Sequence, residues 1–203
     1  MQYRDYKLFS AGNYYHIFNR GVNKQLIFFD DQDYTQFLKR LRIILGKLVL
    51  PPSKSRIQPF APGTFTILAY CLMPNHFHFL IKQNTLINID KLILKLCTSY
   101  VCYINKKYSR IGNLFQDRFK AKLVDTSEYA SYLSAYIHNN PSNVKTYEYS
   151  SFQEILGISP ESICDRSILL SWFENSTTHY EDFVMSHQNR NEEIKKTFDF
   201  EGF

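Results

Sequence analysis

The sequence has no Cys-X-X-Cys pair, no start resembling a signal peptide and no apolar run long enough to cross a membrane. Its cysteines are Cys71, Cys97, Cys102 and Cys164. A membrane-spanning helix needs about 20 consecutive apolar residues, and no stretch approaches that length. These absences argue against a membrane protein and against a disulfide-stapled secreted domain. We therefore expect a cytoplasmic protein with free, mostly buried thiols.

The sequence also lacks internal repeats and low-complexity tracts, and its charge is unevenly distributed. Residues 1–150 carry 20 Lys and Arg against 9 Asp and Glu, whereas residues 151–203 carry 4 against 10. The basic body fits either a polyanion partner or an ordinary soluble surface. The 203 residues are 44% hydrophobic, which is enough for a packed core. We expect one core domain over residues 1–150 and an acidic extension over residues 151–203, which is either a solvated face or an autoinhibitory segment.

Local sequence patterns predict the element order β-α-β-β-α-β-α. Strands are expected at 14–19, 64–73, 76–82 and 119–124, and helices at 30–45, 87–108 and 126–139. The first six elements match the ferredoxin-like arrangement, an antiparallel sheet with two helices on one face. The predicted class is therefore α+β, with a small helical C-terminal extension that has helices near 165–173 and 180–187. Residues 50–63 contain four prolines and predict a mobile basic loop.

Two histidines within one predicted strand are the first candidate for chemistry. His76 and His78 follow the turn residues Pro74 and Asn75. Because strand side chains alternate between faces, both imidazoles project from the same side and can converge on one metal ion. The pattern is weak by itself, since two half-exposed histidines on a sheet face give the same spacing. A metal site needs at least one further ligand.

The helix predicted at 126–139 offers such a ligand. Tyr136 and Asn140 are separated by four residues, so they lie one above the other on the same helix face. The amide oxygen of Asn140 can complete a hard-metal site, which places the Tyr136 hydroxyl beside the metal. The same helix also reads as an ordinary buried aromatic stripe of Tyr129, Tyr132 and Tyr136.

Four blocks of sequence resemble the REP-associated tyrosine transposases, a family of the HUH superfamily of single-strand DNA nucleases. The stretch 68–80 resembles the strand that carries the histidine-hydrophobic-histidine motif. Residues 15–31 resemble the N-terminal block, 113–121 the block before the last strand, and 136–141 the helix that carries the nucleophile. The resemblance covers about residues 12–157, and four blocks in the family's order are more specific than any one of them.

The resemblance implies a role for each matching residue. His76 and His78 match the metal-binding pair, Tyr136 matches the nucleophilic tyrosine, and Asn140 matches the third polar ligand. His16 also falls in a matching block, on a strand expected beside that of His76, and is either a rival third ligand or a DNA contact. The proline-rich segment 50–63 departs from the family pattern, which puts the transfer of DNA specificity in doubt.

The resemblance further implies a metal-dependent endonuclease and strand transferase that cleaves single-stranded or hairpin DNA through a 5′-phosphotyrosine. A phenol is a poor nucleophile at neutral pH without help, and a divalent metal, Mg²⁺ or Mn²⁺ in this family, would supply it. We expect a nucleoid-associated protein, and both a monomer and a homodimer stay open. The DNA-binding candidates are His16, Arg20, Lys24, Arg118, Lys120 and Lys122. Two alternatives remain: a catalytically silent nucleic-acid-binding module of the same fold, and an HUH replication initiator or relaxase, for which Tyr132 would be a second tyrosine.

Overall fold

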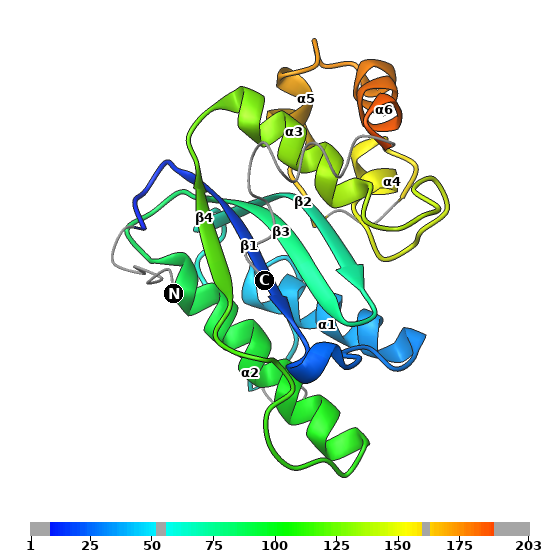
Figure 1. Cartoon of the computed structure of the whole chain (residues 1–203). Coiled ribbons are helices and arrows are strands. Elements are labelled where there is room, and N and C mark those ends of the chain that lie inside the picture. Colours follow the sequence, from blue (N-terminus) through cyan, green and yellow to red (C-terminus); the bar gives the residue numbers. More distant parts are fainter. Residues whose placement is uncertain (1–8, 52–55, 160–162, 189–203) are drawn as a thin grey trace.

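Four antiparallel strands form an open sheet at the centre of the molecule (Figure 1). The computed structural model describes residues 9–51, 56–159 and 163–188. The strands are β1 (Tyr14–Arg20), β2 (Phe65–Met73), β3 (His76–Gln83) and β4 (Lys120–Val124). Their order across the sheet is β2-β3-β1-β4. The first strand of the chain therefore lies between two strands that are synthesised much later.

The strand register decides which side chains share a face of the sheet. His78 of β3 lies opposite Phe18 of β1 and opposite Cys71 of β2. His16 of β1 lies opposite Leu80 of β3 and Lys122 of β4. Because directly opposite residues project to the same face, one face carries both His16 and His78.

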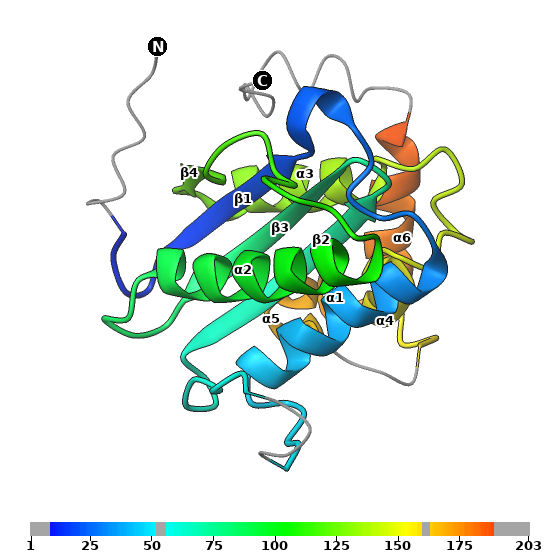
Figure 2. The ribbon, with the colours of Figure 1, turned by 90° about the horizontal axis from the view of Figure 1, so that it is seen from below.

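Two helices cover the other face, as Figure 2 shows. They are α1 (Asp31–Ile44) and α2 (Ile89–Lys107). The α1 helix begins at Asp31 because the Asp30 carboxylate accepts the backbone N–H of Asp33, as an N-cap does. Apolar residues of both helices recur at helical spacing and pack against Phe77 and Phe79 of β3.

Helix α3 (Ser127–His138) covers the face that carries the histidines (Figure 1). It begins after Thr126, whose hydroxyl accepts the backbone N–H of Tyr129. It ends before Pro141, which cannot continue a helix. Leu133 and Tyr136 of α3 are fully buried against the sheet, in one cluster with Leu80 of β3.

The chain after α3 returns along β2 and adds three short helices. These are α4 (Phe152–Ile155), α5 (Arg166–Ser171) and α6 (Thr177–Ser186). Their residues Phe152, Leu169 and Tyr180 are fully buried in the same cluster as the sheet residues Phe77 and Phe79. The described part of the C-terminal extension therefore shares the core of the sheet.

The predicted α+β fold is confirmed, and the predicted elements occur in the predicted order with ends that shift by at most three residues, the largest shift being the start of α6. Within the expected mobile loop 50–63, residues 56–63 form no helix or strand, and Ile57 and Phe60 pack against the core. The N–H of Phe60 donates to the carbonyl of Ile44, and the ammonium of Lys95 lies 3.9 Å from the Phe60 ring. Residues 52–55 and 189–203 fall outside the described part. Among the residues described, no helix is long and apolar enough to span a bilayer.

Candidate active site

The candidate catalytic residues meet between the sheet and α3. Phe77 and Phe79 of β3 pack toward α1 and α2, so His76 and His78 project to the face that α3 covers. The ring centroids of His76 and His78 are 5.1 Å apart. The sequence-based expectation that these two imidazoles share one face agrees with this geometry.

The side chain of Asn75 fixes the ring of His76. Nδ1 of His76 lies 2.7 Å from Oδ1 of Asn75. The amide group of Asn75 is oriented by Nδ2, which donates to the carbonyl of Lys24 over 3.2 Å. Because an amide oxygen only accepts, the proton of a neutral His76 sits on Nδ1, and Nε2 carries the lone pair.

The Nε2 atom of His76 faces the amide oxygen of Asn140. These two atoms are 3.3 Å apart, and the Asn140 amide is oriented by its Nδ2, which donates to the Tyr136 carbonyl over 3.0 Å. In a neutral His76, the lone pair on Nε2 would thus face a lone pair on Oδ1 of Asn140. Such a pair is stabilised by a proton on Nε2 or by a cation that both atoms bind. His76 and Asn140 are both partly exposed, so the site is open to solvent at this point.

A second histidine pair lies deeper. Nε2 of His16 is 2.9 Å from Nδ1 of His78, and the two rings stack at 5.1 Å between centroids. His16 is fully buried, and desolvation together with the charge of Lys122 lowers its pKa to about 3. His16 is therefore neutral at physiological pH, and one imidazole of the pair donates to the other. Its burial places His16 beneath the surface that DNA can touch.

The ring of Tyr136 stands edge-on to the buried histidines. Its centroid is 5.5 Å from that of His78 and 6.3 Å from that of His16. Tyr136 is 1% exposed, so in this conformation it covers His78. Tyr132, one turn earlier, contacts the rings of Phe183 and His187 at the end of α6. Of these two tyrosines, Tyr136 is the one whose ring contacts His16 and His78.

Contacts from α6 hold the C-terminal end of α3. His138 Nδ1 lies 2.7 Å from the hydroxyl of Tyr180, and its Nε2 lies 2.8 Å from the hydroxyl of Ser151. The amide of Asn139 donates to the carbonyl of Val184 over 2.8 Å. His138 and Asn139 are the two residues directly before Asn140. Their contacts therefore hold the backbone from which the Asn140 side chain projects. We call His138, Asn139, Tyr180 and Val184 the α3–α6 clamp.

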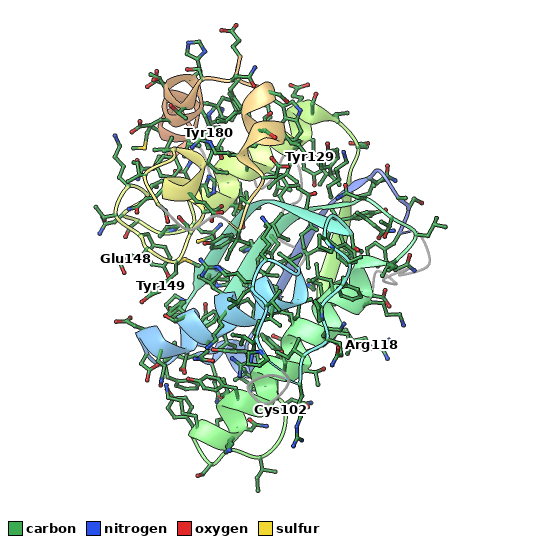
Figure 3. All side chains as sticks on the ribbon, turned by 180° about the vertical axis from the view of Figure 1, so that it is seen from behind. Cys102, Arg118, Tyr129, Glu148, Tyr149 and Tyr180 are labelled. Atoms are coloured by element: carbon green, nitrogen blue, oxygen red, sulfur yellow. The ribbon has the colours of Figure 1, made fainter. Side chains whose placement is uncertain are left out.

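Most of the predicted DNA-binding residues lie on or next to β1 and β4, whereas Lys24 lies beside the β2–β3 turn. Lys120 and Lys122 of β4 share the histidine face, and the Lys120 ammonium is 6.0 Å from the Phe18 ring. The guanidinium of Arg20 donates to Gln116. Lys24 and Arg118 are exposed. In the view of Figure 3, Arg118 lies in the lower part of the molecule and Tyr180 in the upper, C-terminal part.

The donor set fits a hard divalent ion better than a thiolate-type site. Within the described ranges, no three His, Cys, Asp or Glu side chains gather as metal ligands. The predicted set of His76, His78 and Asn140 instead combines two imidazoles with one amide oxygen, ligands that suit several divalent ions. The close approach of Nε2 of His76 to Oδ1 of Asn140 is the observation that supports this fit.

Sequence reasoning missed the residues that orient the proposed ligands. Asn75 was interpreted only as a turn residue, and nothing in the pattern pointed to its amide as the partner of His76. His138 and Tyr180 are 42 positions apart, and no local signal connects them.

Residues 58–140 match the family model described as "Transposase IS200 like". This range includes two of the four blocks that resemble REP-associated tyrosine transposases, 68–80 and 113–121, and all but the last residue of the block 136–141. The fold is similar to that of a REP-associated tyrosine transposase solved bound to a REP hairpin, with a TM-score of 0.53 and 15% sequence identity. The similarity covers 82% of this chain and 98% of that one. The predicted resemblance to tyrosine transposases is confirmed.

Another solved structure, a tRNA(His) guanylyltransferase from Saccharomyces cerevisiae, aligns with a TM-score of 0.36 and 12% identity over 96% of this chain and 80% of its own. That similarity is too low to carry an argument. No curated protein matches the sequence significantly.

Proposed function

We propose that this chain, with its IS200-like transposase region and the fold of a REP-associated tyrosine transposase, cuts and rejoins single-stranded DNA at or near a hairpin. One observation carries the proposal. The Tyr136 ring lies 5.5 Å from that of His78, and Asn140, one helical turn later, brings its amide oxygen to 3.3 Å from Nε2 of His76. A nucleophile and three potential metal ligands thus come from two adjacent elements, β3 and the end of α3.

His76, His78 and Asn140 would hold the divalent ion, Mg²⁺ or Mn²⁺. When bound, it would neutralise charge on the oxygens of the scissile phosphate and position that phosphate. Asn75 and His16 would orient the two imidazoles, because each can accept the Nδ1 proton and leave Nε2 free for a ligand bond. We assign His16 this orienting role rather than that of the third ligand, because its Nε2 lies at hydrogen-bond distance from His78.

Tyr136 would act as the nucleophile. Its hydroxyl oxygen forms a bond to phosphorus, the bond from phosphorus to the 3′-oxygen breaks, and the hydroxyl proton leaves to solvent or to the departing oxygen. The products are a 5′-phosphotyrosine and a free 3′-hydroxyl. Attack by a second 3′-hydroxyl on the phosphotyrosine reverses the step and joins two strands without ATP. Because Tyr136 is 1% exposed, its cover must open before a phosphate can reach it.

The DNA backbone would follow the basic side of the sheet. Lys120 and Lys122 lie on the histidine face, and Arg20 ends the strand opposite His76. Such cations contact phosphates without reading sequence, so they support binding rather than the choice of hairpin. We propose a cytoplasmic, nucleoid-associated protein that works on DNA as a monomer or homodimer.

The test is covalent trapping. The protein is incubated with Mn²⁺ and a hairpin taken from the DNA that flanks its own gene, labelled at its 3′ end because the tyrosine keeps the fragment on the 3′ side of the cut, and the products are separated on a denaturing gel. A labelled protein adduct is expected for the unaltered chain, not for Tyr136→Phe, and still for Tyr132→Phe. His76→Ala should lose cleavage and keep much of the DNA binding. An adduct that persists in Tyr136→Phe contradicts the assignment.

The buried position of Tyr136 favours one competing function, a binding module of the same fold that does not cut. That function predicts hairpin binding by both the unaltered chain and Tyr136→Phe, with no adduct in either. The contacts of Tyr132 with α6 argue against a two-tyrosine nickase, since Tyr132 is engaged by Phe183 and His187.

A further inference from the structure

A cavity of about 460 Å³ lies beside the turn that precedes His76. It is lined by Lys24, Gln25, Leu26, Phe29 and Arg110. These residues come from the loop after β1 and from the segment after α2. The volume falls within the range of small-molecule sites and is sufficient for one nucleobase with its sugar.

Close packing at Gly21 and hydrogen bonds to the β2–β3 turn hold the loop that forms this cavity. A side chain at Gly21 would collide with the carbonyl of Gln25, so only glycine fits there. Lys24 adopts a left-handed backbone conformation, with φ of 59°. The N–H groups of Ile27 and Phe28 both donate to the carbonyl of Pro74, which fixes the loop to the β2–β3 turn. The cavity is therefore preformed beside the proposed active site.

The cavity combines exposed apolar surface with unpaired positive charge. Phe29 is 42% exposed and Leu26 is 46% exposed, high values for large apolar side chains. The guanidinium carbon of Arg110 lies 5.7 Å from the centre of the Phe29 ring. Throughout the described ranges, neither Lys24 nor Arg110 has a carboxylate partner, whereas nearby Lys107 bridges Asp30 and Asp33.

We propose that this cavity binds one unpaired nucleotide of single-stranded DNA. The base stacks on Phe29, and the adjoining phosphates lie near Lys24 and Arg110. An aromatic ring with neighbouring cations is the combination that holds single strands without regard to sequence. Leu26 adds apolar surface to the lining of the cavity. The assignment deepens the proposed function, because it places unpaired DNA within reach of the scissile phosphate.

The cavity is connected to the proposed metal ligands through Asn75. Its Nδ2 donates to the carbonyl of Lys24, in the wall of the cavity, while its Oδ1 holds Nδ1 of His76. The backbone N–H of Gly21 also donates to the carbonyl of Asn75. A nucleotide bound against this loop would therefore also restrict the Asn75 amide that orients His76.

The test uses a fluorescein-labelled dT12 oligonucleotide, because stacking on an aromatic ring does not require a particular sequence. Two variants separate stacking from packing: Phe29→Leu keeps an apolar side chain, and Phe29→Tyr keeps a ring. By anisotropy, Phe29→Leu and Arg110→Ala should weaken dT12 binding at least about fivefold, the lower range for one stacked base. Phe29→Tyr should bind within about twofold of the unaltered chain, and so should Ile111→Ala, a fully exposed neighbour of Arg110.

A second readout locates the base directly. A 2-aminopurine within the oligonucleotide should be quenched on binding, and Phe29→Leu should lose that quenching. Equal dT12 affinity and equal quenching in Phe29→Leu and the unaltered chain would overturn the proposal, and would leave the cavity to another occupant such as a protein partner. The adduct assay is independent. An adduct in the unaltered chain together with unchanged dT12 affinity and quenching in Phe29→Leu contradicts only the cavity assignment, and Phe29-dependent quenching without an adduct contradicts only the cleavage assignment.

Discussion

The imidazole of His76 lies between two amide side chains that would serve it differently. Oδ1 of Asn75 accepts a hydrogen bond from the Nδ1–H of His76, and Asn140 brings an oxygen to Nε2. Loss of a residue that orients a metal ligand typically costs 10–100-fold in metal affinity. We expect Asn75→Ala to weaken Mn²⁺ binding by about that factor, measured as free Mn²⁺ by electron paramagnetic resonance. Asn84→Ala, an exposed amide just after β3, is the control and should bind Mn²⁺ unchanged.

Asn140 provides a complementary prediction. Asn140→Leu keeps the size of the side chain and removes the oxygen, so Mn²⁺ affinity should fall. Asn140→Asp supplies a charged oxygen at the same place, so Mn²⁺ affinity should be retained or increased. Isothermal titration of both variants checks this. Equal Mn²⁺ affinity in Asn140→Leu and the unaltered chain would move the third ligand elsewhere.

Because His138 is buried and neutral, we expect the protein to lose stability in mild acid. Burial lowers the pKa of His138 to about 3, whereas an unfolded histidine titrates near 6.5. Between these values only the unfolded chain binds the proton, so the free energy of unfolding decreases as pH falls below about 6.5. This group contributes about 1.4 kcal/mol per pH unit. Urea denaturation at pH 7, 6 and 5 should show a shallower decline for His138→Gln than for the unaltered chain, and identical slopes would count against the buried neutral state.

At the scale of elements, α6 holds the end of the helix that carries the proposed nucleophile. Tyr180→Phe removes the hydroxyl that contacts His138 and leaves a buried nitrogen without that partner. We expect a loss of about 1–3 kcal/mol in the free energy of unfolding. Because the α3–α6 clamp flanks Asn140, the cleavage rate should also fall, while hairpin affinity stays unchanged.

A matched variant separates position from stability. Tyr147→Phe removes another hydroxyl, one that donates to the carbonyl of Leu72 over 2.6 Å and does not touch the end of α3. It should cost similar stability and leave the cleavage rate intact. If Tyr180→Phe and Tyr147→Phe have comparable cleavage rates at temperatures where both are folded, the α3–α6 clamp contributes to stability and not to the position of Asn140.

The strands and the long helices were predictable because their patterns are local. The alternation in 76–82 and the stripe in 87–108 each report one buried face. The pairing of β1 between β3 and β4 followed only from the ferredoxin-like order. The α3–α6 clamp was not predictable, since Tyr180 and His138 meet through tertiary packing that no spacing encodes. Tyr136 was expected either beside the metal ligands or in a buried stripe with Tyr129 and Tyr132, and the structure buries Tyr136 almost completely while it leaves the other two partly exposed. A helical aromatic stripe predicts that such residues share a face, but not how deeply each one lies.

At the scale of the whole molecule, positive and negative charge are segregated. Lys24, Lys120 and Lys122 belong to the basic body, whereas α6 in the extension carries Glu181 and Asp182. DNA should therefore bind the sheet side. A plot of log affinity against log salt for dT12 should lose about one unit of slope in Lys24→Ala. Lys145→Ala, which removes a cation paired with Glu181 on the extension side, should keep the full slope.

The family match covers residues 58–140, yet the sheet is not complete within that range. β1, at Tyr14–Arg20, supplies the strand between β3 and β4 and carries His16. This part of the site was predictable only from the N-terminal block of the resemblance. The cavity at Phe29 was not predictable at all, because two chain segments about 80 residues apart form its walls.

The α3–α6 clamp also sets the order in which the protein becomes competent during synthesis. The ribosome releases His76, His78, Tyr136 and Asn140 well before α6, which begins at Thr177. A chain that stopped short of that helix would contain every proposed catalytic group and lack the contacts that fix the end of α3. Strand cutting would then be the last property the polypeptide acquires, and a prematurely terminated copy would also lack Tyr180 and Val184 from the core.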